Sequence, residues 1–132
     1  VYVGTININS NPTLAIKVLL EANEHDGPAI IIAYSSCIAH GIVGGLEESL
    51  TMGNLATKCG YFPLVHYNPT SKQFSLDSKD CNFDLYEEFL NNQSRYNMLK
   101  VINKNHASEL LKNNKLDAME LYDYYVSLDQ KK

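Results

Sequence analysis

The chain has 132 residues, enough for one domain with a modest hydrophobic core. An apolar content of 45% argues against general disorder, and a formal charge of -4 gives no electrostatic basis for binding nucleic acid or an anionic membrane. No apolar run approaches the roughly 18 residues that span a bilayer, so we expect no membrane segment. The three cysteines form no CxxC pair, which favours a reduced, intracellular setting.

The amino-terminal part predicts a strand–helix–strand unit with a right-handed crossover. Residues 1–8 are rich in Val, Ile and Thr, and they begin as a strand already under way, so we expect a piece of a longer protein. Asn11 and Pro12 are a preferred helix cap and first helical residue, which predicts a helix over 12–24. Residues 29–34 form an unbroken apolar run, typical of a parallel-sheet strand that is covered on both faces.

The middle of the chain predicts one helix and two further strands. Residues 46–58 have an amphipathic pattern, with Gly60 near the carboxyl-terminal cap. Three leucines of this helix are expected to point inward: Leu46, Leu50 and Leu55. Residues 61–67 predict a third strand, in which Pro63 is tolerated only at an edge or at the strand's start. Residues 73–76 alternate and predict a hairpin partner for it.

From residue 77 the pattern becomes helical and rich in tyrosine. Three helices are predicted there, over residues 85–90, 95–102 and 106–128. The pair Asn113–Asn114 is a candidate break in the last helix. We therefore expect an α/β part over 1–76 and a helical carboxyl-terminal extension over 77–132.

Cys37 and His40 follow the predicted strand over 29–34 and are the only close cysteine–histidine pair. In open α/β sheets, ligands bind beyond the carboxyl ends of strands, so this pair lies where chemistry is usually placed. Three interpretations remain open: a buried thiol beside a helix-capping histidine, a nucleophilic cysteine activated by His40, and one ligand of a cluster completed from elsewhere. Against the nucleophile, the sequence shows no third group that would orient His40 as a base. A zinc site is also not indicated, because Cys37 and His40 are only two of the four ligands that zinc needs. Spacing alone does not favour the cluster.

Residues 31–42, IIAYSSCIAHGI, resemble the segment "IIAYSPCIAHGI" of the pyruvate:ferredoxin oxidoreductases, a family also called pyruvate synthases. Four further matches follow the same order and spacing over about residues 1–125. They are residues 60–69 with "GYWPLYRYNP", residues 74–79 with "FQLDSK", Arg95, Tyr96 and Leu99 with "RYxxL", and residues 23–28 with "AExYxGP". The chain is thus similar to the carboxyl-terminal part of that family's thiamine diphosphate-binding domain, which implies the parallel-sheet portion of an α/β fold.

The resemblance implies an enzyme that converts pyruvate and coenzyme A to acetyl-CoA and CO2. It also implies thiamine diphosphate, Mg2+ and 4Fe–4S clusters, with electrons passed to ferredoxin, flavodoxin or a fused reductase domain. The parent protein would be a homodimer in the cytoplasm, or in a hydrogenosome-like or mitochondrial organelle of a eukaryote. No catalytic residue falls in this segment.

The resemblance also assigns individual residues. Cys37 matches the fourth ligand of the cluster nearest the thiamine, and His40 stands beside it to tune its potential. Asn11 alone keeps its identity in the family's "GAN" segment, which makes it a candidate cofactor contact. Cys59 and Cys81 match no family cysteine, so we interpret both as packing or surface thiols.

Some family features differ or are missing. Ser36 replaces a frequent proline, and His66 replaces a common arginine. The other three cluster thiolates, the "GDG" magnesium segment and the pyruvate-binding domain are absent from these 132 residues. We therefore expect the isolated chain to be inactive and to bind neither thiamine diphosphate nor an intact cluster. The alternative is a homologous, non-catalytic assembly module of a larger redox protein, against which the presence of Cys37 argues.

Overall fold

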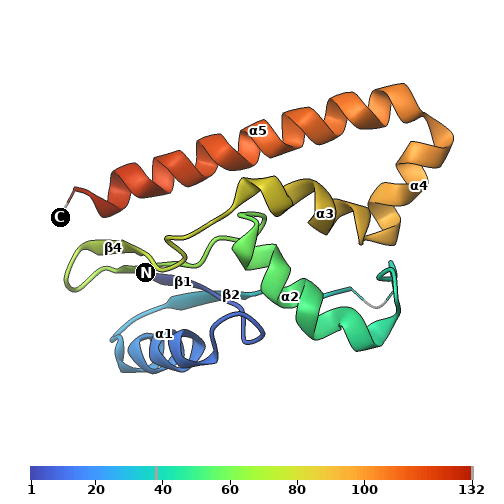
Figure 1. Ribbon diagram of the computed structural model, residues 1–132. Helices are drawn as coiled ribbons and strands as arrows, with labels where there is room; N and C mark the ends of the chain where they lie inside the picture. Colours follow the sequence, from blue (N-terminus) through green and yellow to red (C-terminus); the bar gives the residue numbers. More distant parts are fainter. Residues whose placement is uncertain (38, 132) are drawn as a thin grey trace.

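The computed structural model describes residues 1–37 and 39–131 and shows an α/β fold, as predicted (Figure 1). The strands are β1 (Tyr2–Ile6), β2 (Ala29–Ala33), β3 (Val65–Asn68) and β4 (Gln73–Leu76). They form one sheet in the order β2-β1-β3-β4. Strands β1 and β2 are parallel, while β3 is antiparallel to both of its neighbours. The sheet is therefore mixed, and only its β1–β2 part has the expected parallel arrangement.

The predicted strand–helix–strand unit is confirmed. Helix α1 (Pro12–Glu24) starts at the predicted cap, where the Asn11 side chain accepts a 2.9 Å hydrogen bond from the Leu14 backbone N–H. The helix packs on one face of the sheet around Val18, which is fully buried. A Cβ at Gly4 would lie 2.5 Å from Val18 Cγ1. Glycine on β1 therefore permits the close approach of α1 to the sheet.

The expectation that residues 29–34 are covered on both faces is wrong for this chain. Strand β2 lies at an edge of the sheet, and Ile30 and Ile32 are 53% and 50% exposed. Ile31 alone of the three isoleucines packs against the α1 core. The apolar run has the composition of a central strand, but among the described residues only β1 and α1 cover it.

The helix predicted over 46–58 forms, with a different buried face. A short 3-10 turn (Leu46–Glu48) leads into α2 (Ser49–Lys58), and Gly60 follows with a positive φ of 82°. Leu46 and Leu50 are 59% and 68% exposed, so their inward assignment is wrong, whereas Leu55 does pack against the core. The buried face is made of smaller or more flexible residues: Met52, Gly53, Ala56 and Thr57.

Long-range hydrogen bonds explain this face. The buried Asn7 side chain donates to the Gly53 carbonyl oxygen at 2.7 Å and to the Thr57 hydroxyl at 2.9 Å. A Cβ at Gly53 would meet Asn9 Nδ2 at 2.4 Å. Helix α2 therefore approaches the loop after β1 through its smallest residues, a contact that its own hydrophobic pattern does not reveal.

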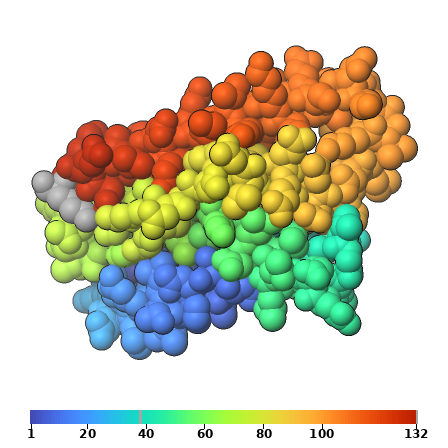
Figure 2. Space-filling model, in the orientation of Figure 1, coloured from blue at the N-terminus to red at the C-terminus, as the bar shows by residue number. Residues whose placement is uncertain are grey.

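The three helices predicted after residue 77 form close to their predicted ranges. This part of the chain comprises a 3-10 turn (Phe83–Leu85), α3 (Tyr86–Asn91), α4 (Ser94–Ile102) and α5 (Lys104–Asp129). Helix α5 continues through the candidate break, and Asn114 accepts a 2.7 Å hydrogen bond from the Tyr86 hydroxyl. Figure 2 shows α5 in orange and red along one side of the molecule and α1 in blue on the opposite side. No helix among the described residues is long and apolar enough to cross a bilayer.

Candidate functional site

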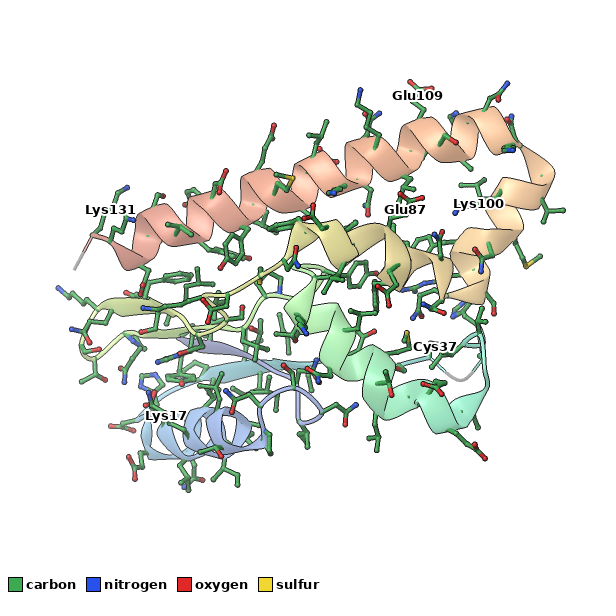
Figure 3. All side chains as sticks on the ribbon, in the orientation of Figure 1. Lys17, Cys37, Glu87, Lys100, Glu109 and Lys131 are labelled. Carbon is green, nitrogen blue, oxygen red and sulfur yellow. The ribbon has the colours of Figure 1, made fainter. Side chains whose placement is uncertain are left out.

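The thiol of Cys37 and the imidazole of His40 meet in the loop after β2. Cys37 Sγ lies 2.9 Å from His40 Nδ1, and both side chains are exposed. Figure 3 shows Cys37 at the end of the molecule opposite the labelled Lys131. The exposure of Cys37 argues against the buried-thiol interpretation.

The loop that carries this pair is held on its amino-terminal side by the sheet and α2. Tyr34 follows β2 and packs its ring against Phe62, with ring centroids 5.3 Å apart. Its backbone N–H also donates to the Ile6 carbonyl oxygen at 2.9 Å, which extends the β1–β2 ladder. The Ser36 hydroxyl reaches the Ser49 carbonyl oxygen at 3.4 Å. Cys37 therefore projects from a segment whose preceding residues are fixed.

The carboxyl-terminal side of the loop is held by the turn between α3 and α4, residues 92–94. The Val43 N–H donates to the Asn92 carbonyl oxygen at 3.0 Å, and the Ser94 N–H donates to the Gly41 carbonyl oxygen at 3.2 Å. Between these bonds, Ile42 and Gln93 form an isolated antiparallel bridge. We call this contact the loop clamp. It fixes the loop directly after His40, so the helical extension takes part in positioning the site.

The pair cannot form a complete metal site or a complete catalytic triad from the described residues. No group of three or more His, Cys, Asp or Glu side chains in the described chain could hold a metal ion. No third side chain among these residues bonds His40 in a way that would orient it as a base for Cys37. What the loop offers is one exposed cysteine whose sulfur lies beside an imidazole nitrogen.

Asn11 lies apart from this pair. Parallel strands β1 and β2 end at the same edge of the sheet, so the loops that carry Asn11 and Cys37 lie along that edge. Asn11 and its neighbour Ser10 line a hollow of about 220 Å³ whose other lining residues come from α2 and from residues 64–81, with none from the Cys37 loop. Its side-chain oxygen caps α1, and its amide nitrogen makes no hydrogen bond within the described part of the chain.

The other two cysteines are packed, as interpreted from the sequence. Cys59 is fully buried beside the Ala56 carbonyl oxygen, and burial raises the pKa of its thiol to about 11. Cys81 is partly buried, lies 3.4 Å from the carbonyl oxygens of Thr57 and Ser78, and has its pKa raised by burial. Neither thiol has the exposure of Cys37.

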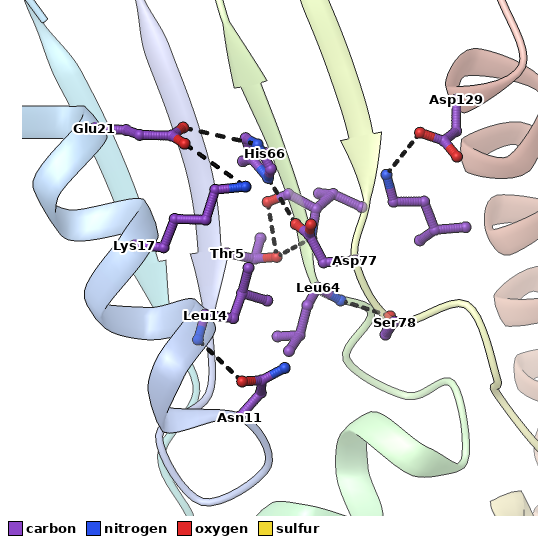
Figure 4. Close-up of polar contacts among 12 residues, drawn as sticks. Thr5, Asn11, Leu14, Lys17, Glu21, Leu64, His66, Asp77, Ser78 and Asp129 are labelled. Atoms are coloured by element: carbon purple, nitrogen blue, oxygen red, sulfur yellow. Dashed lines mark hydrogen bonds and ion pairs between the residues drawn. The ribbon is translucent and has the colours of Figure 1, made fainter.

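Sequence reasoning missed a polar cluster between α1, β3 and the segment after β4 (Figure 4). His66 is 6% exposed, and its Nδ1 and Nε2 atoms lie 2.7 Å and 3.7 Å from carboxylate oxygens of Asp77 and Glu21. Glu21 also accepts a 3.0 Å hydrogen bond from the Tyr2 hydroxyl, whose pKa is raised by burial and by this carboxylate. No local pattern signals the cluster, because its members come from different elements. It joins α1 to the sheet.

Together, these features define an α/β fold with an exposed cysteine–histidine pair beyond the carboxyl end of a parallel strand. Comparison with known proteins gives the family. No protein-family model matches the chain. It is 35% identical over 122 residues to pyruvate dehydrogenase (NADP(+)), mitochondrial, of Euglena gracilis, covering 89% of this chain and 7% of that protein. It is 34% identical over 133 residues to the pyruvate:ferredoxin oxidoreductase of Moorella thermoacetica, covering 97% and 11%.

A third relative, the pyruvate-flavodoxin oxidoreductase of Enterobacter agglomerans, is 32% identical over 133 residues, again covering 97% of this chain and 11% of the relative. The chain therefore belongs to the pyruvate:ferredoxin oxidoreductase family, as its sequence motifs predicted. It spans only 7–11% of the length of these relatives.

Proposed function

We propose that the chain is a segment of an enzyme that oxidatively decarboxylates pyruvate with coenzyme A, in which Cys37 supplies one thiolate ligand to a 4Fe–4S cluster. The observation that carries this proposal is the exposed Cys37 in the loop after β2, within the segment that resembles the family's "IIAYSPCIAHGI". The parent enzyme would hold thiamine diphosphate and Mg2+ and pass electrons to ferredoxin or flavodoxin. It would work in the cytoplasm or in a mitochondrion-like organelle.

The residues present fit the role of a partial ligand set. A cluster would supply one-electron transfer, which needs proximity and no proton chemistry in this segment. Cys37 as a thiolate could only accept a hydrogen bond. His40 would therefore carry its proton on Nδ1 and donate a hydrogen bond to Sγ across the observed 2.9 Å. Such a hydrogen bond reduces the charge on the sulfur and raises the reduction potential of the group it ligates. Asn11, with a free amide nitrogen at the same sheet edge, remains a predicted cofactor contact.

The test uses the full-length parent protein and three single substitutions: Cys37→Ser, Cys59→Ser and Cys81→Ser. Cys37→Ser should lower the iron and sulfide content by about one cluster and weaken the reduced-cluster signal after pyruvate is added. The other two changes should leave the iron content unchanged, because Cys59 is buried in the core and Cys81 is partly buried against backbone carbonyl oxygens. Equal iron in all variants would favour the alternative, a non-catalytic assembly module. The isolated 132-residue chain should form no acetyl-CoA.

A further inference from the structure

Helices α3, α4 and α5 surround a hollow of about 270 Å³, which we call the helix hollow (Figure 1). Most of its wall is apolar and consists of Leu90, Tyr96, Leu99, Ala107, Leu110 and Leu111. An apolar cavity of about 150 Å³ is already large enough to bind benzene, and pockets between packed helices are common ligand sites. The helix hollow has room for about nine groups of the size of a water molecule, which suits a ligand of about eight to ten non-hydrogen atoms.

The polar side chains of the helix hollow present hydrogen-bond donors. The Asn91 amide oxygen is bonded by the Lys100 ammonium group, and the Asn114 amide oxygen accepts a 2.7 Å hydrogen bond from the Tyr86 hydroxyl. Both amide oxygens are therefore occupied, and neither amide nitrogen donates a hydrogen bond within the described residues. The ammonium group has three N–H donors, of which the bond to Asn91 uses one. A ligand with an oxygen acceptor would complete this arrangement.

The charges in the lining define that acceptor more closely. Among the described residues that line the helix hollow, Lys100 is the only cation and Asp117 is the only acid. Figure 3 shows Lys100 reaching from α4 toward the space between α3 and α5. A hydrogen bond from an ammonium group to a carboxylate is about twice as strong as a neutral one. One carboxylate therefore fits beside Lys100, while the exposed Asp117 disfavours a second negative charge on the ligand.

We propose that the helix hollow binds a small apolar monocarboxylate of about the size of octanoate. Its carboxylate would accept hydrogen bonds from Lys100 and Asn91, which already contact each other. Its hydrocarbon chain would lie against the leucine side chains of the wall. Asn114, whose amide oxygen is held by Tyr86, would supply a further donor at the edge of the site.

The helix hollow adjoins the loop clamp. Asn91 is the last residue of α3, directly before the turn that forms the clamp, and its contact with Lys100 joins α4 to this point. A ligand that binds both side chains stabilises their arrangement. Exchange of the Val43 and Ser94 amides, which donate across the clamp, should therefore slow when the ligand is bound. An effect of the ligand on iron bound at Cys37 would rest on the proposed function, whereas the binding itself does not.

Equilibrium dialysis of the full-length parent protein with radiolabelled octanoate tests the binding. We expect saturable binding with a Kd at or below about 1 mM, as for an efficient ligand of this size. Lys100→Met removes the charge at nearly constant length, so it should weaken octanoate binding at least about tenfold and change 1-octanol binding less than about twofold. Lys112, which is exposed on α5 and does not line the hollow, provides the matched control, and Lys112→Met should bind both compounds like the unmodified parent.

Two further measurements locate the site. Ala107 is 5% exposed in the wall of the helix hollow, so the ring introduced by Ala107→Phe should fill the space and weaken the binding of both octanoate and 1-octanol. A photoactivatable octanoate analogue should label residues 86–117 of the parent. Absence of saturable binding, equal octanoate affinity in Lys100→Met and Lys112→Met, or labelling only elsewhere in the parent would each overturn the proposal.

Hydrogen exchange of the parent, followed by mass spectrometry, tests the connection to the loop clamp. Peptides that contain Val43 or Ser94 should exchange more slowly with saturating octanoate than without it. Unchanged exchange in both peptides would refute the connection. Full iron in Cys37→Ser with octanoate binding retained would refute the proposed function alone, so the two proposals fail separately.

Discussion

Gly41 offers the sharpest test of how the Cys37 loop is held. Its φ of +74° lies in the left-handed region, and a Cβ there would sit 3.0 Å from Ser94 Oγ in the loop clamp. Gly41→Ala therefore combines backbone strain with a tight contact. We expect the change to weaken the clamp without unfolding the domain, because the loop lies outside the buried clusters.

The expected magnitude follows from two terms. Placing an L-residue in the left-handed region lowers the stability of the folded loop by about 1–2 kcal/mol. Alanine also makes the unfolded chain less flexible than glycine does, which offsets about 0.4–1 kcal/mol of this loss. We expect about 1 kcal/mol for Gly41→Ala. Gly45→Ala is a control for backbone strain outside the loop clamp: Gly45 has φ +92° and ψ -173°, a region that essentially only glycine adopts, and nothing lies within 4 Å of an added Cβ. That change should cost about 1–3 kcal/mol without a contact to Ser94.

Amide exchange at Val43 and Ser94 measures this loss locally, because both N–H groups donate across the clamp. A loss of about 1 kcal/mol predicts roughly fivefold faster exchange at these two amides. In the double variant Gly41→Ala/Ser94→Ala, the close contact between the added Cβ and the Ser94 hydroxyl is gone but the backbone strain at residue 41 remains. Only part of the lost stability should therefore return. Unchanged exchange at both amides in Gly41→Ala would show that the turn between α3 and α4 does not hold the loop.

Three further outcomes are expected. His66→Ala should lower the free energy of unfolding, measured by urea titration, by about 2–3 kcal/mol, because it leaves the partly buried carboxylates of Asp77 and Glu21 without their shared partner. His66→Gln keeps an amide donor and should cost less. Equal losses for the two variants would contradict a stabilising role of these contacts. Iodoacetamide at pH 8 should modify Cys37 within minutes and Cys59, whose pKa burial raises to about 11, only after denaturation; mass spectrometry showing two fast sites would contradict this. Stability should fall as the pH rises from about 10 to about 12. Burial raises the pKa of Tyr96 and Tyr122 from 10.0 to about 12 in the fold, so their neutral forms stabilise it below pH 10 and this contribution is lost on ionisation. A flat unfolding free energy over that range would refute the assignment.

Local signals predicted most of the secondary structure. Asn11 and Pro12 mark the start of α1, and the helices of the extension form close to their predicted ranges. Cys37 and His40 could be placed at a strand end because the apolar run before them is unambiguous. Each of these features depends on residues close together in the sequence, where propensity and capping act directly.

Features that depend on distant residues could not be predicted. Helix α2 packs through Gly53 because Asn7 bonds its carbonyl oxygen, so the leucines that dominate the hydrophobic pattern face outward. The antiparallel direction of β3 depends on its pairing with β1, which no feature of residues 61–67 specifies. The cluster around His66 joins elements that are far apart in the chain.

The loop clamp links the helical extension to the proposed chemistry. The Asn92–Ser94 turn bonds the backbone on the carboxyl-terminal side of His40, while Tyr34 and the β1–β2 ladder fix the amino-terminal side of Cys37. A thiolate that ligates a cluster gains from a rigid backbone on both sides, because movement of the ligand changes the environment that sets the potential. Sequence that lies far from the cysteine motif thus has a direct structural role in it. The extension matters to the site through two backbone hydrogen bonds and a glycine that allows them to form.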